Sequence, residues 1–481
     1  PWNETTPEWK ELKASITIPA INEGYPVDSV IAVVVSSGGS YLEHAQVDHH
    51  LKGGLWQKHY QEGRKLYSWD NSLSSGFMRP AVDFGKARRM FQLSLSEAVT
   101  DEQKAASLLA VGEMRLYDQK ESNWKDVRGN FEDALKLPSA GDADRALALL
   151  GIGETFLREK KYPAAMASFE AASEACSKES IKDRVQLLKG FSYMQQRDYA
   201  RSLEILNALV AKESLERTSR DLALDYIAAM RQSAKIRRSR PRLFFSEKTW
   251  PAVRDRALGE EKEYFEKIRK ESENLGLKEG EKKDYGLNLM KAAFVYRVTG
   301  NKALLEKIQM MFRSTCDYYL ARENHDHTRS YSRVSALAAL DWTWEDLPED
   351  ERESFFSDLL FYSYSVYLED RIQGRLDRHY VYYVQDMLWY AGAAFLDEKL
   401  DDVIHARVMC LLGHGYRQEE MMFSSMLDAS GDDGAWQVKL DYAFGHQPTV
   451  FWAFMYSWQA ATGEPIPPEW VHIINPDYVL R

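Results

Sequence analysis

The chain has 481 residues, of which 44% are hydrophobic and 28% charged, and its formal net charge is −11. This composition is typical of a folded protein of two to four domains and excludes fibrous and disordered chains. The acidic balance argues against nucleic acid as the main partner. No apolar run reaches the roughly 18 residues of a membrane-spanning helix, so no membrane span is expected.

The cysteines do not form a recognisable pattern. Cys176, Cys316 and Cys410 lie far apart in helix-like surroundings, which predicts buried free thiols and neither a disulfide framework nor a zinc site. The chain begins at Pro1 without a signal-peptide pattern. A chain of this size does not need disulfides, so an oxidising compartment is not excluded.

Residues 1–90 form the first predicted unit, a small and partly β segment. SITIPAI and SVIAVVVSS have the composition of β-strands, and Gly-rich and Ser-rich turns follow. In the next stretch His44, Asp48 and His49 would share one side of a helix, a spacing that could hold a structural metal ion. The alternative is polar surface histidine, because the spacing matches no recognised metal motif. No other cofactor is expected.

Residues 91–235 are predicted to be helical and repetitive. Gly153 and Phe169 recur 37 residues later as Gly190 and Leu206, and the small and large residues around them keep the same shift. The pattern resembles tetratricopeptide repeats, in which small residues allow close helix contact and aromatic residues fill the gaps. The resemblance implies packing or the binding of a protein partner, and no chemistry.

Residues 241–481 form the third predicted unit, which the basic linker 235–245 joins to the repeats. Amphipathic segments alternate with short polar turns, and no strand pattern intervenes. Paired helices rich in Trp and Tyr predict a ring of helical hairpins, an (α/α) toroid. The expected fold class is therefore mostly α, with tetratricopeptide-like repeats followed by a toroid and a partly β segment at the N-terminus.

The stretch from residue 432 to 458 contains the main candidate site. Asp432, Asp433 and Gly434 form a turn signal, and a buried apolar helix is predicted from Pro448. Polar and aromatic side chains lie at the entry to that helix: Trp436, Gln437, Lys439, Tyr442, His446 and Gln447. So many titratable groups at one helix entry indicate a ligand site, although such residues also satisfy backbone groups.

Two cationic clusters indicate an anionic ligand. One holds Arg322, His325, His327, Arg329 and Arg333, and the other holds Arg371, Arg375, Arg378 and His379. Both lie at predicted turns, where helix ends could border a cleft. Tyr382 and Gln385 follow the second cluster, and an aromatic ring can stack on a sugar face. The alternative is a solvated surface balanced by neighbouring acidic residues.

Four local patterns resemble, in the same order, segments of the heparinase II/III and alginate lyase superfamily of polysaccharide lyases. They are PRLFFSEKTWPAVRDRA, ALAALDWTWEDLPEDERESF, RHYVYYVQDMLWYAGAAFLDE and DDGAWQVKLDYAFGH. The resemblance covers residues 241–481. It implies binding of an acidic polysaccharide, cleavage of uronate linkages by β-elimination, and a secreted or periplasmic location.

The resemblance also implies roles for single residues. β-Elimination needs a group that neutralises the uronate carboxylate, a base for the adjacent proton and an acid for the departing oxygen. Tyr442 would act as the acid–base tyrosine, His379 as carboxylate neutraliser or base, and His446 as the supporting cation. Arg378 replaces the family's Asn and could clamp a carboxylate with two hydrogen bonds. The family's β-sandwich domain has no counterpart after the toroid, so an incomplete or inactive enzyme is also considered.

Two other functions remain open. A toroid glycoside hydrolase acting on unsaturated uronides would use Asp432 or Asp433 as acid or base, so Asp433→Asn would abolish activity while Tyr442→Phe would not. A non-catalytic scaffold would bind polysaccharide, or no sugar at all, without cleaving a bond, and its repeats would recruit a protein partner.

Overall fold

The structure, a computed structural model, describes residues 21–22, 25–30, 49–51, 54–67, 83–321, 330–372, 387–430 and 447–472. Within these residues the protein is mostly helical. Three short strands, β1 (Ile21–Asn22), β2 (Tyr25–Val30) and β3 (His49–Leu51), form an antiparallel sheet in the order β1-β2-β3. The predicted strand that begins at Ser29 overlaps the described residues only at the end of β2.

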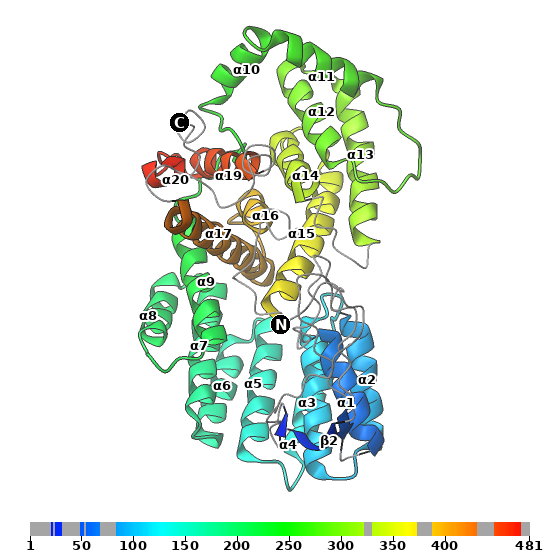
Figure 1. Cartoon of the computed structure of the whole chain (residues 1–481), viewed down its shortest axis with the longest axis vertical. Coiled ribbons are helices and arrows are strands. Elements are labelled where there is room, and N and C mark those ends of the chain that lie inside the picture. The colour runs from blue at the N-terminus through cyan, green and yellow to red at the C-terminus, as the bar shows by residue number, and fades with distance from the viewer. Residues whose placement is uncertain are drawn as a thin grey trace, which may run out of the picture.

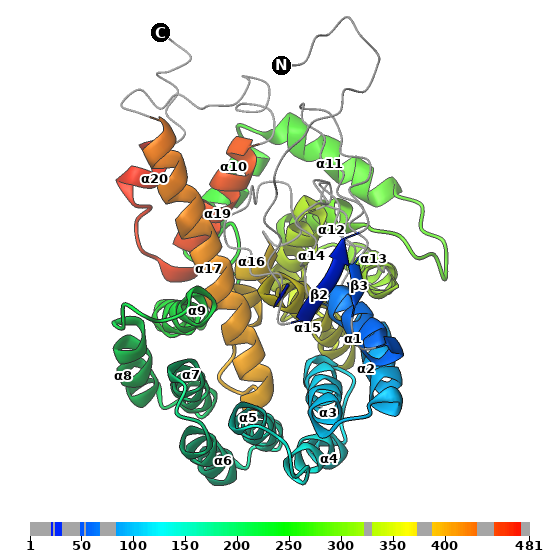
Figure 2. The ribbon, with the colours of Figure 1, turned by 60° about the horizontal axis from the view of Figure 1, so that its bottom comes forward.

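The first group of helices is the repeat block, in which short turns join consecutive helices from the second helix onward. Its members are α1 (Gly54–Tyr67), α2 (Phe84–Glu97), α3 (Asp101–Tyr117), α4 (Trp124–Leu135), α5 (Asp142–Arg158), α6 (Tyr162–Ala175), α7 (Glu179–Gln195), α8 (Tyr199–Val210) and α9 (Arg217–Ser233). Figure 2 shows α3 to α9 as an arc.

Glycines bring the two helices of a pair into close contact. A Cβ atom on Gly153 would lie 2.3 Å from the ring of Phe169, and one on Gly190 would lie 2.5 Å from Leu206. These are the residues that recur in the sequence. The first residues of α5 and α7 are 37 positions apart, as are those of α6 and α8. The sequence repeat therefore corresponds to a repeat of helix pairs.

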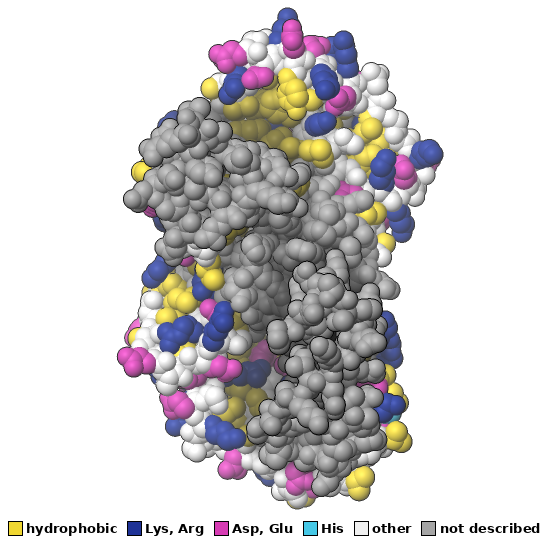
Figure 3. Space-filling model, viewed as in Figure 1, with side chains coloured by type: hydrophobic (Ala, Val, Ile, Leu, Met, Phe, Trp, Pro, Cys, Tyr) yellow, Lys and Arg dark blue, Asp and Glu magenta, His cyan; other side chains and the backbone are white. Residues whose placement is uncertain are grey.

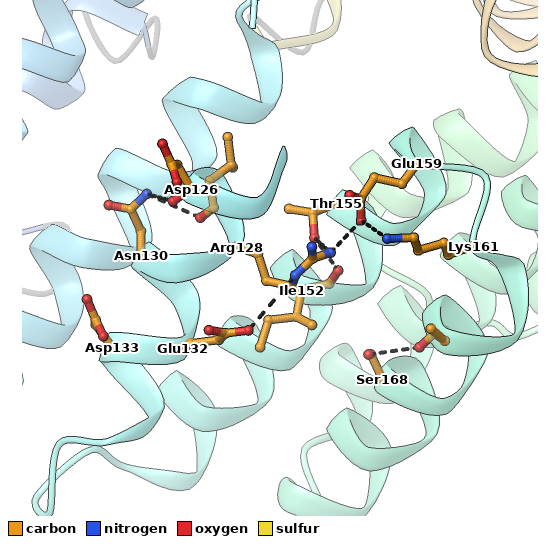
Figure 4. Close-up of polar contacts among 12 residues, drawn as sticks. Asp126, Arg128, Asn130, Glu132, Asp133, Ile152, Thr155, Glu159, Lys161 and Ser168 are labelled. Carbon is orange, nitrogen blue, oxygen red and sulfur yellow. Dashed lines mark hydrogen bonds and ion pairs between the residues drawn. The ribbon is translucent and has the colours of Figure 1, made fainter. Parts of the chain in front are cut away.

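A buried arginine joins α4 to α5 (Figure 4). Arg128 donates from Nη1 to Glu159 at 2.7 Å and to the hydroxyl of Thr155 at 3.3 Å, and its guanidinium lies 4.1 Å from the ring centre of Phe156. The hydrogen bond from Arg128 holds the pKa of Glu159 below its usual value. The charge is satisfied within the scaffold, so this cluster stabilises the block and leaves no group available for a ligand.

The second group of helices, the C-terminal block of residues 237–472, lies above the repeat block in Figure 1. It contains α10 (Trp250–Leu258), α11 (Lys262–Asn274), α12 (Gly286–Thr299), α13 (Lys302–Leu320), α14 (Ser330–Thr343), α15 (Glu349–Ile372), α16 (Met387–Phe395), α17 (Asp402–Ser430), α19 (Gln447–Thr462) and α20 (Pro468–His472). Among the described residues, no helix combines the length and the apolar character needed to cross a membrane.

Alternate helices of the C-terminal block run parallel. A Cβ atom on Gly286 of α12 would meet the backbone of Ser332 in α14, and Arg297 of α12 donates to the carbonyl of Trp342 in α14 at 2.8 Å. In both contacts the two residues are separated by nearly the same number of positions in the sequence. The two helices therefore run parallel. Aromatic stacks relate α13 to α15 in the same way. The block is thus an array of helical hairpins.

The long helix α17 lies between α16 and α9. A Cβ atom on Gly415 would lie 2.1 Å from the backbone nitrogen of Trp389 in α16, and one on Gly413 would lie 2.0 Å from the carbonyl oxygen of Asp225 in α9. Only glycine permits backbones to approach this closely. Contacts on two sides of α17 therefore tie the repeat block to the C-terminal block.

The second half of the predicted linker, residues 241–245, is largely buried and hydrogen-bonded. The side chain of Asp341, which is 0% exposed, accepts from the backbone nitrogens of Arg242 at 2.6 Å and Leu243 at 2.9 Å. It also pairs with Nη1 of Arg240 at 2.8 Å. One carboxylate of α14 thus fixes the path of this basic stretch.

The same stretch crosses the C-terminal ends of several helices. Arg242 donates to the carbonyls of Ala393 at 3.1 Å and Leu396 at 2.6 Å, at the end of α16. The backbone nitrogen of Phe244 donates to the hydroxyl of Ser457 in α19 at 3.0 Å. Because Asp341 lies near the end of α14, the C-terminal halves of α14, α16 and α19 gather on residues 237–245.

The hydrophobic core does not divide at residue 235. One cluster of buried side chains extends from Leu187 of α7 to Trp470 of α20. The last repeat helices therefore share a core with the C-terminal block. Cys176, Cys316 and Cys410 are buried and free, as the sequence predicted.

Candidate functional site

The residues that carry the predicted chemistry lie outside the described residues. They are Tyr442, His379, His446, Arg378, Trp436, Gln437, Lys439, Arg375, Tyr382, Gln385, His325, Arg329 and the alternative acids Asp432 and Asp433. The backbone of Gln447 begins α19, but its side chain is also outside the description. The structure does describe the helix ends that precede and follow these residues.

Three segments hold these residues, and each lies between two described helices. Residues 322–329 join α13 to α14, residues 373–386 join α15 to α16, and residues 431–446 join α17 to α19. The C-terminal halves of α14, α16 and α19 gather on residues 237–245. The three segments attach at the N-terminal ends of these helices, which are the ends farther from residues 237–245.

A polar cluster lies at the N-terminal ends of α12 and α14. Oδ1 of Asp284 accepts hydrogen bonds from the hydroxyls of Ser332 at 2.6 Å and Tyr319 at 3.0 Å, and from the backbone nitrogen of Gly286 at 3.0 Å. Oδ2 is buried without a hydrogen-bond partner. Such an acceptor is rare in folded proteins and suits a hydroxyl group of a ligand or an ordered water molecule.

Arg333 belongs to the first predicted cationic cluster, but it is only 1% exposed and does not lie on the surface. Its Nε donates to the hydroxyl of Tyr362 at 2.7 Å, and its guanidinium lies 5.0 Å from the ring centre of Tyr319. Burial raises the pKa of Tyr362, and Arg333 opposes that increase. The prediction of a cleft-lining or solvated charge was wrong for this arginine, because two stacked tyrosines enclose it.

Glu419 of α17 is a second buried titratable group. It is 3% exposed, its Oε2 has no hydrogen-bond partner, and burial raises its pKa to about 8. Because α17 runs antiparallel to α16 and Gly415 lies level with Trp389, Glu419 lies further toward the N-terminal end of α16. A buried carboxyl with a pKa near neutrality is typical of functional sites.

The sequence missed Asp284, Tyr319, Tyr362 and Glu419. The two tyrosines occur among apolar helix positions, where aromatic residues usually form core. Glu419 is followed by Glu420, so the pair is typical of a solvated helix face. No local signal separates Glu419 from an exposed glutamate, because its burial depends on the packing of α17.

A neighbouring charged network joins α17 to α9. Nδ1 of His414 lies 2.7 Å from Oδ2 of Asp225, and Nη1 of Arg417 donates to Oδ1 of the same carboxylate at 2.7 Å. Gln418 contacts the other ring nitrogen of His414 at 3.1 Å. These contacts partner both carboxylate oxygens and both ring nitrogens, so we assign the network to the scaffold.

Metal binding was predicted for the His-rich N-terminal stretch. His44, Asp48 and the side chain of His49 lie outside the described residues. His59 from the same stretch lies 2.7 Å from Glu97 and joins α1 to α2. Across the part of the chain that the structure describes, no three His, Cys, Asp or Glu side chains are grouped to hold a metal ion.

Comparison of the chain with protein-family models, with curated proteins and with solved structures gives no match. The function is therefore argued from the residues and the arrangement of the helices.

Proposed function

We propose that the protein is a polysaccharide lyase-like enzyme that cleaves a uronate-containing acidic polysaccharide by β-elimination. In this proposal an (α/α) toroid carries the chemistry and tetratricopeptide-like repeats precede it. The supporting observation is that the C-terminal halves of α14, α16 and α19 contact residues 237–245, while their N-terminal ends continue into the three segments that hold the proposed site residues. Helix N-termini carry partial positive charge, which favours an anionic polymer.

The proposed reaction uses residues of two of these segments. Arg378 and His379 neutralise the uronate carboxylate, so that charge developing on it is stabilised. Tyr442 takes the proton next to the carboxylate, and an acid returns a proton to the departing glycosidic oxygen as the carbon–carbon double bond forms. His446 lowers the pKa of the tyrosine from its ordinary value of about 10.

Two described residues limit the negative charge at the same helix ends, where Asp284 supplies a carboxylate. Glu419 has a pKa raised to about 8 by burial, so it is largely protonated at neutral pH and adds no full negative charge there. Arg333 lies fully buried beside Tyr319 and Tyr362, and its positive charge offsets the carboxylate of Asp284. A secreted or periplasmic location would expose the protein to such polymers.

The test is ultraviolet absorbance during incubation with alginate, heparan sulfate, chondroitin sulfate, hyaluronan and ulvan. β-Elimination creates a conjugated double bond that absorbs, whereas hydrolysis creates none. We expect absorbance to rise with at least one polymer, and Tyr442→Phe to reduce the rate by at least about a hundredfold, as loss of an acid–base group does.

Tyr456→Phe is the matched control. Tyr456 lies on α19 and is 48% exposed, so removal of its hydroxyl should leave the rate unchanged. A flat trace with every polymer and a folded protein would contradict the proposal. New reducing ends without absorbance, lost in Asp433→Asn, would instead establish the hydrolase alternative.

A further inference from the structure

A cavity of 730 Å³ lies between the repeat block and the C-terminal block. The α7–α8 turn, the end of α9, linker residues 236–242 and the α16–α17 turn supply its walls. Five cationic side chains line it, Arg197, Arg237, Arg238, Arg242 and Lys399, against two carboxylates, Asp397 and Glu398. This is a local excess of positive charge in a chain whose net charge is −11.

Arg197 is bound mainly by uncharged groups. Its Nη1 and Nη2 donate to the carbonyls of Glu398 and Leu400, each at 2.6 Å. The carboxylate of Asp402 is 3.8 Å from its Nε, which is buried without a hydrogen bond. The two carbonyl oxygens hold the guanidinium in place, and the ion pair with Asp402 offsets part of its charge.

Arg242 shows the same pattern. Its terminal nitrogens donate only to the carbonyls of Arg238, Ala393 and Leu396, and its Nε is buried without a partner. Burial, and then repulsion by Arg240, lowers its pKa to about 10. The group remains charged at neutral pH, and Asp341 and Asp397 offset part of that charge.

The carboxylates offset only part of this charge. Glu398 pairs with Arg238 at 2.5 Å, and Asp397 accepts from the backbone nitrogen of Lys399 at 2.8 Å. Among the described residues, the side chains of Arg237 and Lys399 have no hydrogen-bond or ion-pair partner. Arg237 is nevertheless positioned, because its guanidinium packs against Gly463, where a Cβ atom would lie 1.8 Å from Nη2.

One wall of the cavity is polar and uncharged. Nε2 of His405 lies 2.8 Å from the hydroxyl of Tyr199. Burial, and then the charge of Arg197, lowers the pKa of His405 to about 4, so the ring is neutral at pH 7. The Lys and Arg side chains elsewhere are mixed with acidic ones on the visible described face in Figure 3. The cavity therefore differs from that surface in having cations gathered around a hollow.

We propose that this cavity binds a small polyvalent anion bearing phosphate or carboxylate groups. Arg237 and Lys399 contact the anion, and Arg197 and Arg242 supply the surrounding positive field. The walls belong to both blocks, so the bound anion also stabilises their contact. The inference does not rest on the lyase proposal, because the cavity lies at the C-terminal end of α16, opposite the segment that holds Arg378 and His379.

The experiment is calorimetric titration of the full chain with pyrophosphate and, separately, with citrate at fixed low ionic strength. The cavity variant combines Arg237→Gln with Lys399→Gln. The control variant combines Arg231→Gln with Lys248→Gln, two exposed cations outside the cavity lining. We expect saturable binding by the wild type, at least about tenfold weaker binding by the cavity variant, and no change in the control.

The identity of the tighter ligand decides between the two chemistries. Tighter binding of pyrophosphate assigns a phosphate ligand, and tighter binding of citrate assigns a carboxylate ligand. Absence of saturable heat with both anions overturns the proposal, as does equal affinity of the wild type and both variants. If the cavity variant does not fold, the thermal unfolding of the wild type decides: pyrophosphate or citrate must raise its midpoint above that in sodium chloride of equal ionic strength.

Discussion

His405 illustrates how one side chain takes its properties from two parts of the chain. Its ring is buried between Tyr199 of the repeat block and the start of α17, beside the guanidinium of Arg197. A histidine in α17 could not be assigned this role from sequence, because residues about 200 positions away supply its neighbours. The low pKa of about 4 makes the ring sensitive to acid.

We expect protonation of His405 to lower the free energy of unfolding as the pH falls. Its pKa is near 6.5 in the unfolded chain and about 4 in the folded protein, so the unfolded state binds more protons between these values. The free energy of unfolding should therefore decrease by up to about 3 kcal/mol as pH falls from ~6.5 to ~4, relative to His405→Gln. Urea unfolding at a series of pH values measures this difference.

The glutamine variant keeps a polar partner for Tyr199 but does not titrate. It removes this contribution while leaving the other acidic groups in place. Parallel pH profiles of the two proteins would show that His405 has the same pKa in the folded and unfolded states and would contradict the assignment.

At the scale of elements, glycine decides which helices touch. The sequence showed small residues recurring with large ones in the repeat block, and the structure brings Gly153 onto Phe169 and Gly190 onto Leu206. No comparable pattern marks α17 in the sequence, where Gly413 and Gly415 contact helices from two different blocks. Periodicity identifies a helix and its small residues, but the partner of each face depends on chain topology.

Gly413→Ala should destabilise the protein by at least about 2 kcal/mol, because the new Cβ atom meets the backbone of α9. Gly129→Ala is the control. Gly129 lies inside α4 with no atom within 4 Å of the new Cβ position. The alanine there should stabilise by roughly 0.5–1 kcal/mol through helix propensity.

Chemical unfolding of both variants tests the contact between α17 and α9. We expect Gly413→Ala to lower the free energy of unfolding and Gly129→Ala to raise it. A neutral or stabilising Gly413→Ala would show that the two helices can separate without cost.

At the scale of the whole molecule, residues 237–245 determine how the helices are directed. The sequence predicted a basic linker at this place. The structure buries Leu243 and Phe245 and uses Arg240 and Arg242 to hold helix ends together. These contacts fix the C-terminal ends of α14, α16 and α19. The proposed site residues attach at the other ends of the same helices.

Asp341→Asn should cost about 3–5 kcal/mol of unfolding free energy. The asparagine keeps the shape of the side chain but leaves the charge of Arg240, whose side chain is 7% exposed, without its counter-ion. Asp133→Asn is the control, because its pairing with Lys136 is at the surface and should change stability by less than about 1 kcal/mol. Urea unfolding measures both, and a cost below that of the control would contradict the role of Asp341.

The sequence by itself determined the mostly helical character, the recurring helix pairs, the three buried thiols and the absence of a membrane-spanning helix among the described residues. These features follow from composition and from local periodicity, which neighbouring residues set. The tertiary structure alone decided that Arg333 is buried, that Glu419 is a buried acid, that four arginines and a lysine surround a cavity, and that the core continues across residue 235. Burial and charge balance at these positions depend on residues distant in sequence, and only the packing of helices brings them together.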